Sequence, residues 1–316
     1  MSTAGRSRER GSGAGARART GGRLTAPTAD AHSSRTPSRR DGAAKSAPSG
    51  TLRPLAAMPP AVRARANVVL CDIDDTLSTH GRIPAVAYAA LERLTGAGLL
   101  VVPITGRPAG WCDHIARMWP VAGVVGENGA FWMRYDAPGR RLVKRFRDDA
   151  AKRAEQRARL NAIGAKIIAA VPGCALASDQ LYRETDLAID FCEDVPPLPR
   201  EAVDRIVELM QAEGMTAKIS SIHVNGWFGR YDKLDMTRTL FAEAFGIDVD
   251  SARERIVFVG DSPNDAPMFA HFPLSVGVAN VRKQADRIAT LPAYVTVAEG
   301  GEGFAELARS LLAAGR

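Results

Sequence analysis

The stretch that decides the fold spans residues 68–77 and reads Val68-Val69-Leu70-Cys71-Asp72-Ile73-Asp74-Asp75-Thr76-Leu77. Its first four residues form a short apolar run, which is typical of a central strand in a parallel sheet covered on both faces. Three acidic residues, at positions 72, 74 and 75, follow this run closely. Because active sites in open α/β sheets gather at the carboxyl ends of strands, these acids are the first candidates for a functional site.

Alternating strands and helices continue on both sides of this stretch. After it, the pattern predicts a helix over 84–97, a strand over 99–104, a helix from Pro108 and a strand over 121–125. Toward the end of the chain it predicts a helix over 233–245, a strand over 256–259, a helix over 266–271, a strand over 274–278 and a helix after Gly303. This alternation indicates βαβ units, so the expected fold class is α/β with a doubly wound parallel sheet.

The residues between these two halves follow a different pattern. They predict a hairpin over 131–135 and 142–146, helices over 149–171 and 200–213, and strands near 187–191, 216–220 and 222–224. This mixture indicates a small α/β cap domain inserted into the sheet domain. We therefore expect a catalytic core over 67–128 and 231–316 and a cap over 129–230.

The first 66 residues carry most of the positive charge. The chain holds 42 basic and 35 acidic residues; this segment contains 13 and 3 of them, so the remainder is close to neutral. The segment is rich in Gly, Ser, Ala, Arg and Pro, which predicts a disordered basic tail over 1–66. A basic arm for nucleic acid is one interpretation. A solvated tail, or a start at Met58, explains the composition more simply, so nucleic acid is not an expected partner.

Cysteine usage and hydropathy argue against several classes of protein. The four cysteines show no CxxC or Cys/His metal spacing, and nothing upstream of the first strand resembles a secretory signal. No run of about 18 apolar residues is present, so no membrane span is expected. A cytoplasmic protein with reduced thiols is the simplest interpretation.

Acidic and phosphate-binding residue types gather at the ends of the predicted strands. Asp72 and Asp74 are two residues apart, so in an extended segment both carboxylates point to one side, roughly 7 Å apart. Asp261, in the run Gly260-Asp261-Ser262-Pro263-Asn264-Asp265, brings a third acid to the same edge. Together these acids predict a hard oxygen-ligand site for Mg²⁺.

These residue types fit phosphoryl transfer. With a metal masking the charge of a phosphate group, one Asp oxygen can attack phosphorus to form an aspartyl-phosphate. The second Asp can give a proton to the leaving alkoxide and later take one from water. The hydroxyl of Thr105, the amide of Gly106 and the ammonium of Lys233 are suitable donors for the phosphoryl oxygens.

Four motifs resemble those of the haloacid dehalogenase (HAD) superfamily. The run at 72–77 is similar to its first motif, Asp-x-Asp-x-Thr, while Thr105, Lys233 and the run at 260–265 are similar to the second, third and fourth motifs in the expected order. The resemblance covers about 67–316. It implies that Asp72 is the nucleophile and that Asp74 is the acid/base, with its main-chain carbonyl facing Mg²⁺.

The other motif residues take their roles from the same resemblance. It implies that Thr105, Lys233 and Asn264 bind phosphate and that Asp261 binds the metal. Asp265 would support the metal shell or hold Lys233. The implied metal site therefore comprises Asp72, Asp74, Asp261 and Asp265.

The insert is similar to the α/β cap of HAD subfamily IIB. That group includes Cof-like hydrolases and sucrose-, trehalose- and mannosylglycerate-type sugar phosphatases, and the runs Glu127-Asn128-Gly129-Ala130 and Gly277-Val278-Ala279-Asn280 fit it. Asp75 and Leu234 depart from the pattern, since both stand where Gly is frequent. The resemblance implies a Mg²⁺-dependent phosphatase acting on a small phosphorylated metabolite, a sugar or sugar-acid phosphate.

Four further residues are candidates for substrate contact. Arg107 has two equally good interpretations, as a ligand of a substrate anion or as the partner of an acid at a helix start. Asn128 stands at the expected hinge and can touch substrate or simply form a turn. His223 and Asn225 lie late in the cap, where they can reach a sugar, although a structural histidine is the more common case.

Three alternative functions remain open. A phosphomutase of the same superfamily keeps the Asp pair but returns phosphate to the sugar. A phospho-receiver module also combines Asp, Thr and Lys on a doubly wound sheet, although the motif order and the large insert disfavour it. A nucleic-acid phosphatase guided by the basic tail is the third. The oligomeric state cannot be read from these patterns.

Overall fold

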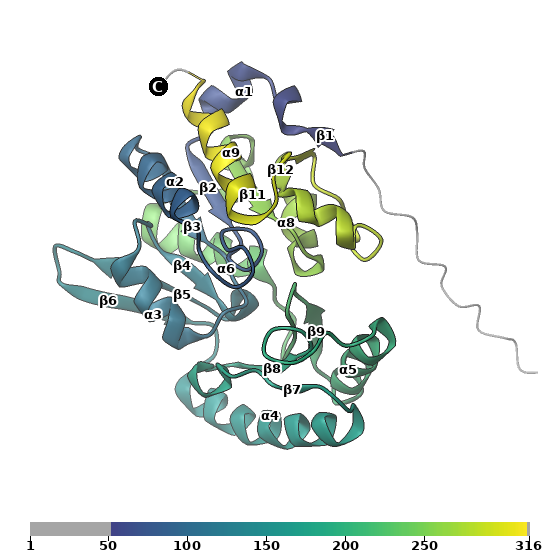
Figure 1. Cartoon of the computed structure of the whole chain (residues 1–316). Helices are drawn as coiled ribbons and strands as arrows, with labels where there is room; N and C mark the ends of the chain where they lie inside the picture. The colour runs from purple at the N-terminus through teal and green to yellow at the C-terminus, as the bar shows by residue number, and fades with distance from the viewer. Residues whose placement is uncertain (1–51, 315–316) are drawn as a thin grey trace, which may run out of the picture. The chain divides into compact units, whose positions relative to one another are not determined.

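The expected strand at Val68–Cys71 forms β2 of a six-stranded parallel sheet (Figure 1). The computed structural model describes residues 52–314. The strand order is β1-β13-β12-β11-β2-β3, and every neighbouring pair is parallel. The other strands are β1 (Arg53–Pro54), β3 (Leu100–Pro103), β11 (Ile256–Gly260), β12 (Leu274–Gly277) and β13 (Tyr294–Val295).

Apolar side chains cover both faces of this sheet. In β2, Val69 and Cys71 pack into one hydrophobic cluster, while Val68 and Leu70 pack into another. The first cluster is completed by α2 (Ala85–Gly96), α3 (Ala109–Met118) and α9 (Gly300–Leu312). The second is completed by α6 (Lys233–Leu240), the π-helix Phe241–Phe245, α7 (Val249–Ala252) and α8 (Ala266–His271). The predicted doubly wound α/β sheet is confirmed.

The direction of winding reverses between β2 and β11. From β2 the chain continues to β3 on one side, and it later returns to β11 on the other side before building β12 and β13. Asp72 follows β2 and Asp261 follows β11. In open α/β sheets ligands bind at this kind of switch point, so the topology brings the two acids to the expected place.

A second, three-stranded sheet adjoins the large one. It consists of β4 (Val124–Gly126), β5 (Phe131–Asp136) and β6 (Arg141–Phe146) in antiparallel order. The apolar residues of β5 pack into the two clusters of the large sheet. The cap predicted over 129–230 includes this hairpin; from this packing we propose instead that the cap begins after it, near Asp148.

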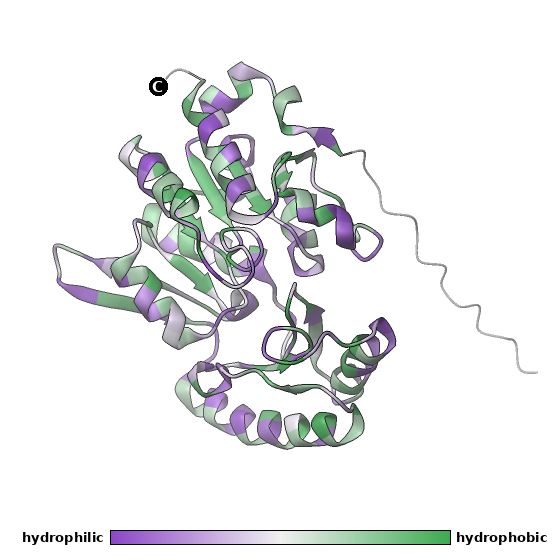
Figure 2. Cartoon of the chain, in the orientation of Figure 1, coloured by the Kyte–Doolittle hydropathy of each residue, from purple (hydrophilic) through white to green (hydrophobic). Residues whose placement is uncertain are grey.

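The cap contains a four-stranded antiparallel sheet with its own core. Its strands are β7 (Ala175–Leu176), β8 (Asp186–Asp190), β9 (Thr216–Ile219) and β10 (His223–Trp227), in the order β7-β8-β10-β9. Leu187, Ile189 and Val224 pack with α4 (Ala150–Ala170) and α5 (Arg200–Ala212). Figure 2 shows the alternating hydropathy of α4. Because side chains alternate along a strand, Asp186, His223 and Asn225 lie on the opposite face of this sheet.

Residues 52–66 fold onto the core, so the expectation of disorder up to residue 66 is wrong for this segment. β1 pairs with β13, and Leu55 and Met58 are buried in the core. In α1 (Pro60–Arg65), Arg63 Nη1 donates to Ser310 Oγ at 2.9 Å. These few apolar residues find partners far along the chain, which composition alone does not reveal. The rest of the predicted tail, 1–51, lies outside the described residues.

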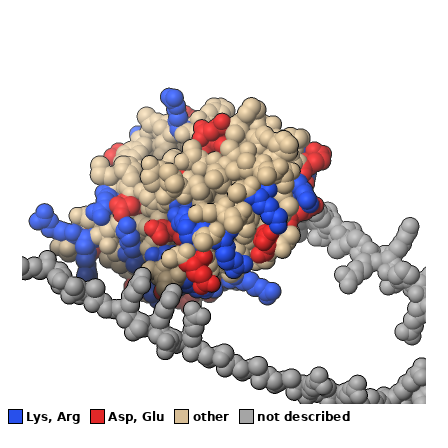
Figure 3. Space-filling view, turned by 90° about the horizontal axis from the view of Figure 1, so that it is seen from below, with Lys and Arg blue, Asp and Glu red and all other residues tan. Residues whose placement is uncertain are grey.

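Three surface and chemical features bear on the other expectations. Cys71 is buried in apolar packing, as predicted, and all four cysteines are free thiols. Within 52–314, none of the helices has the length and apolar character needed to span a bilayer. Seen from the α4 side, basic and acidic side chains are interspersed (Figure 3).

Candidate active site

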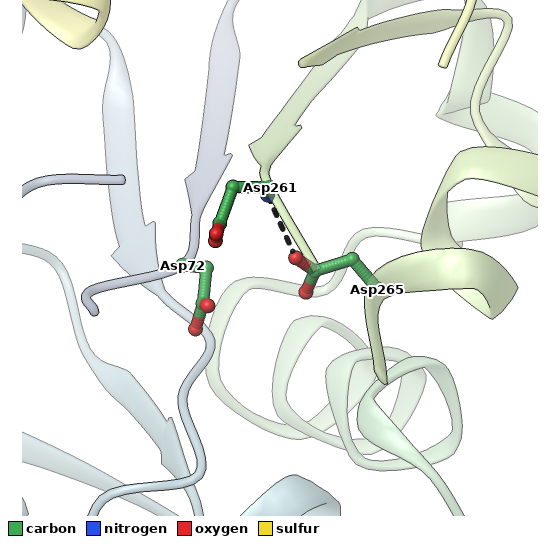
Figure 4. A group of neighbouring side chains, drawn as sticks. All are labelled: Asp72, Asp261 and Asp265. Atoms are coloured by element: carbon green, nitrogen blue, oxygen red, sulfur yellow. Dashed lines mark hydrogen bonds between the residues drawn. The ribbon is translucent and has the colours of Figure 1, made fainter. Parts of the chain in front are cut away.

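Three buried carboxylates meet at the switch point of the large sheet. Asp72, Asp261 and Asp265 each offer an oxygen, and these oxygens lie within 4.8 Å of one another (Figure 4). Asp72 and Asp261 come from the ends of neighbouring strands, and Asp265 comes from the short 3-10 helix Pro263–Asp265. The resemblance implies a metal site of these three acids and Asp74, and the group of three does not include Asp74.

Lys233 connects two of these acids. Its Nζ donates to Asp72 Oδ1 at 3.0 Å and to Asp265 Oδ1 at 2.7 Å. The other oxygen of Asp265 accepts hydrogen bonds from the backbone amides of Asp261 and Ser262. Asp265 therefore orients both Lys233 and the loop that carries Asp261.

The charges of the cluster do not balance. Burial raises the pKa of Asp72 to about 7, opposed by Lys233 and reinforced by Asp265. Burial, with Asp72 adding to it, also raises the pKa of Asp261 well above its ordinary value. Burial acts to lower the pKa of Lys233, but Asp265 and Asp72 outweigh it and raise that pKa. One ammonium contacts two of the three acids, so a further cation would stabilise the ionised cluster.

The donor set suits Mg²⁺, which prefers hard oxygen ligands and keeps part of its water shell. Asp261 is oriented by Thr76 Oγ1, which donates to its Oδ1 at 3.1 Å, and by Asn280 Nδ2, which donates to its Oδ2 at 3.2 Å. One oxygen of Asp265 accepts a hydrogen bond from Lys233, and the other accepts from backbone amides. The residues that would hold the ion are thus Asp72 and Asp261, with Asp265 in support.

Asp74 lies apart from the trio and pairs with Arg107. Arg107 Nε donates to both carboxylate oxygens of Asp74 at 3.0 Å, and Nη2 donates to Oδ1 at 2.8 Å. Arg107 thus pairs with an acid that lies after β2 and not at a helix start, and its role as a ligand of a substrate anion stays a prediction. The role of the Asp74 main-chain carbonyl stays a prediction.

Arg107 also joins the core to the cap. Its Nη1 donates to Asp179 Oδ2 at 3.1 Å, and Nη2 contacts Glu193 Oε1 at 2.5 Å. From the cap side, Arg183 binds Asp179 and donates to the Gly106 carbonyl oxygen at 2.9 Å. We call Arg107, Asp179, Arg183 and Glu193 the cap latch. The side chains of both arginines are at most 4% exposed, so their ion pairs lie away from bulk water.

Gly106 lines the same small cavity as Asp72 and Asp74, and the phosphate-binding role of Thr105 and Gly106 stays a prediction. The hydroxyl of Thr105 is buried and accepts from the Arg107 amide at 3.0 Å. A Cβ on Gly106 would lie 3.1 Å from Asn128 Nδ2, so this side chain closes tightly over the glycine. Asn128 Oδ1 accepts from Asn264 Nδ2 at 3.1 Å, whereas Asn128 Nδ2 is buried without a hydrogen-bond partner among the described residues.

The turn at Glu127–Gly129, where the sequence predicts a hinge, adopts an unusual backbone. All three residues have positive φ, at 42°, 54° and 107°. For non-glycine residues such angles cost on the order of 1–3 kcal/mol and persist only where the surroundings impose them. Here Glu127 accepts hydrogen bonds from the Ala109 amide in the core and from Thr185 in the cap. The strain places the Asn128 side chain against Gly106.

The two cap candidates face the site but are held by acids. Asn225 Nδ2 donates to Asp186 Oδ2 at 3.0 Å, and His223 Nε2 lies 2.9 Å from Glu193 Oε2. Both line a small cavity that also contains Asp72, Asp74 and Asn264.

Some functional candidates carry no motif of their own. The cap latch acids Asp179 and Glu193 escaped the sequence reasoning because their partner Arg107 lies more than 70 residues away. The run Gly277-Val278-Ala279-Asn280 contains Asn280 but does not by itself indicate its contact with Asp261. Asp75 departs from Gly at a position where φ is 53°, which Asp tolerates better than most side chains.

Comparisons with known proteins complete the description. No protein-family model matches the sequence. A phosphoglycolate phosphatase from Methanopyrus kandleri is 30% identical over 133 residues. These residues are 41% of this chain and 51% of that protein, so the chain matches about half the length of this relative.

Solved structures match over most of the described chain. A HAD subclass IIB sugar phosphatase has a TM-score of 0.52 at 15% identity, covering 78% of this chain and 96% of that one. The sucrose-phosphatase from Synechocystis sp. PCC6803, solved with sucrose and phosphate, has a TM-score of 0.54 at 16% identity, covering 77% and 97%. In fold, the chain therefore resembles the subclass IIB phosphatases of the haloacid dehalogenase superfamily, as its motifs predict.

Proposed function

We propose that the chain is a Mg²⁺-dependent phosphomonoesterase that uses Asp72 as its nucleophile and acts on a small sugar or sugar-acid phosphate. The convergence of Asp72, Asp261 and Lys233 at the switch point of the sheet carries this proposal. Sugar phosphates are suggested by the names of the structural relatives and stay a proposal for this chain. The orphaned donor of Asn128, beside Gly106, is of the kind that suits a phosphoryl oxygen.

In the first half of the reaction, an Asp72 oxygen attacks phosphorus in line while the bond to the ester oxygen breaks. The Lys233 ammonium and the Thr105 hydroxyl bind the phosphoryl oxygens. Asp74 gives a proton to the leaving oxygen, which departs as an alcohol. Since Arg107 binds the Asp74 carboxylate in the structure, Asp74 has to exchange this partner for the leaving group.

In the second half, water attacks phosphorus and the bond to Asp72 breaks. Asp74 takes the proton of that water, so both aspartates return to their starting forms and inorganic phosphate leaves. Mg²⁺, when bound by Asp72 and Asp261, masks the negative charges of the phosphate and of these carboxylates.

The test is phosphate release from a panel of sugar, sugar-acid, nucleotide and cofactor phosphates with Mg²⁺. We expect release that is lost in Asp72→Asn and on addition of EDTA, and retained in Asp113→Asn, which changes a half-exposed acid of α3 outside the site. Release that persists in Asp72→Asn would refute the proposed nucleophile. Movement of phosphate to another hydroxyl of the same sugar, without free phosphate, would identify a phosphomutase instead.

A further inference from the structure

A second cavity, mainly apolar, adjoins the catalytic one. It has a volume of about 470 Å³, within the range of small-molecule sites. Three aromatic and three aliphatic side chains line it, namely Trp111, Trp119, Tyr182, Ile73, Ile83 and Ile115. We call it the aromatic pocket.

The aromatic pocket meets the catalytic cavity at two residues. Asp74 and Arg107 line both, whereas Asp72 lines only the catalytic cavity. In an in-line displacement the leaving oxygen departs on the side opposite the nucleophile, next to the acid that protonates it. With Asp72 as nucleophile and Asp74 as acid, the organic part of the ester extends toward the aromatic pocket.

Two of these aromatic side chains are exposed rather than buried in the core. Trp111 is 42% exposed and its ring stacks against the Arg107 guanidinium, 4.4 Å from Cζ to the ring centroid. Tyr182, from the cap, is 59% exposed and lies against Gly110, where a Cβ would come within 2.9 Å of its own Cβ. Flat rings placed in this way favour a flat apolar ligand.

Several polar groups on the cap face already hold hydrogen bonds within the protein, so they are not free to bind the hydroxyls of a polyol. Asp186 accepts from Arg183 and Asn225, and Asp190 accepts from three backbone amides at 192–194. A site that selects sugar hydroxyls needs polar groups that are free to pair with them. On this face, the carboxylates of Asp186 and Asp190 and the amide nitrogen of Asn225 are already paired within the protein.

We infer that the preferred substrate is a phosphomonoester whose alcohol carries an aromatic ring, held in the aromatic pocket between Trp111 and Tyr182. This inference rests on the proposed function and narrows its substrate class. A sugar phosphate that bears a heteroaromatic base fits both the proposed function and this inference. The sugar phosphate meets the first, and the aromatic ring of the base can stack in the pocket.

The test uses pairs of esters in which one alcohol carries an aromatic ring and the other does not. Adenosine 5′-monophosphate is compared with ribose 5-phosphate, and benzyl phosphate with ethyl phosphate. We expect kcat/KM to be at least about tenfold higher for the aromatic member of each pair. In Trp111→Ala and in Tyr182→Ala this ratio falls toward one. In Leu181→Ala, whose side chain is 93% exposed next to Tyr182 and outside the lining, the ratio stays as in the wild type.

Binding without turnover separates this inference from the proposed function. Benzylphosphonate and ethylphosphonate have a P–C bond in place of the ester, and their Kd values are measured by calorimetry on the full chain with Mg²⁺. Tighter binding of the benzyl compound, lost in both aromatic variants, supports the pocket even if no ester is hydrolysed. Equal Kd values, or an ester ratio near one alongside clear phosphate release, would overturn the inference and leave the phosphatase standing.

Discussion

The guanidinium of Arg107 binds the carboxylate of Asp74 through Nε and Nη2, at 2.8–3.0 Å. The same guanidinium contacts Asp179 and Glu193 in the cap. One core arginine therefore pairs with the candidate acid/base and with two acids that approach from the cap. In the proposed mechanism, its position would couple proton transfer at Asp74 to the contact between cap and core.

Replacing Arg107 is expected to destabilise the protein strongly. Arg107→Gln leaves three carboxylates without their shared cation, and breaking a buried ion pair in this way costs about 3–5 kcal/mol. The matched control is Arg117→Gln, which removes a half-exposed pair with Asp113 on α3 and should cost at most about 1 kcal/mol. Urea denaturation measures both free energies of unfolding. Similar losses in the two variants would contradict the claim that the cap latch stabilises the protein.

The contribution of Glu193 to stability is expected to depend on pH. Burial alone would raise the pKa of Glu193, but contacts with His223 and Arg107 outweigh it and lower the pKa to about 2, from an ordinary value of 4.5. The folded state thus favours the carboxylate, so its contribution is full above about pH 4.5 and disappears as the pH falls toward 2.

The variant Glu193→Gln tests this dependence. Because the Glu193 side chain is 22% exposed, solvent screens the pair, and we expect a loss of about 1–2 kcal/mol near pH 6. Near pH 3 the wild type and the variant should differ by less. The measurement is the free energy of unfolding at both pH values. A loss that stays constant with pH would show that the ionisation of Glu193 does not contribute to stability in this way.

Gly129 is expected to be irreplaceable because the chain approaches it closely. Its φ is +107°, and a Cβ there would lie 2.0 Å from the carbonyl oxygen of Asp232, the residue before Lys233. Gly129→Ala should therefore cost about 2–4 kcal/mol and displace Lys233 from Asp72. Gly96→Ala, at the end of α2 with open space around it, should be neutral or stabilising by up to about 1 kcal/mol. Equal melting temperatures for the two variants would show that the close approach is not needed.

Magnesium is expected to stabilise the folded chain independently of any substrate. An ion that binds the folded state alone adds about 2.7 kcal/mol at a concentration 100 times its Kd. Thermal unfolding with and without Mg²⁺ should show this shift in the wild type and in Asp113→Asn, and lose it in Asp261→Asn. A shift of the same size in Asp261→Asn would place the ion elsewhere.

The sheet and its catalytic edge could be predicted because they depend on local patterns. The apolar run before Asp72 determines a buried strand, and the alternation of elements determines the winding, so the strand ends that carry Asp72 and Asp261 follow from the sequence. Short strands such as β1 and β13 could not be predicted in this way. Each has only two residues, and β1 is held in the described sheet only by pairing with β13, about 240 positions away.

The cap contacts could not be predicted, because they depend on side-chain direction and on long-range pairing. No local pattern indicates that Arg107 binds Glu193 across 86 residues. Likewise, the sequence of the hairpin β5–β6 does not indicate which of the two domains it packs against. Its attachment to the core comes from Phe131 and Met133, whose partners lie on other elements.

The most direct test of the central claim is to trap the covalent intermediate on Asp72. The enzyme is mixed with an active phosphate ester and Mg²⁺, quenched in acid within one turnover and reduced with borohydride, which converts an aspartyl-phosphate to homoserine. Peptide mass spectrometry should find homoserine at position 72, only when ester is present and not in Asp72→Asn. Rapid phosphate release with aspartate unchanged at position 72, or with the label at another residue, would contradict the assignment of Asp72 as the nucleophile.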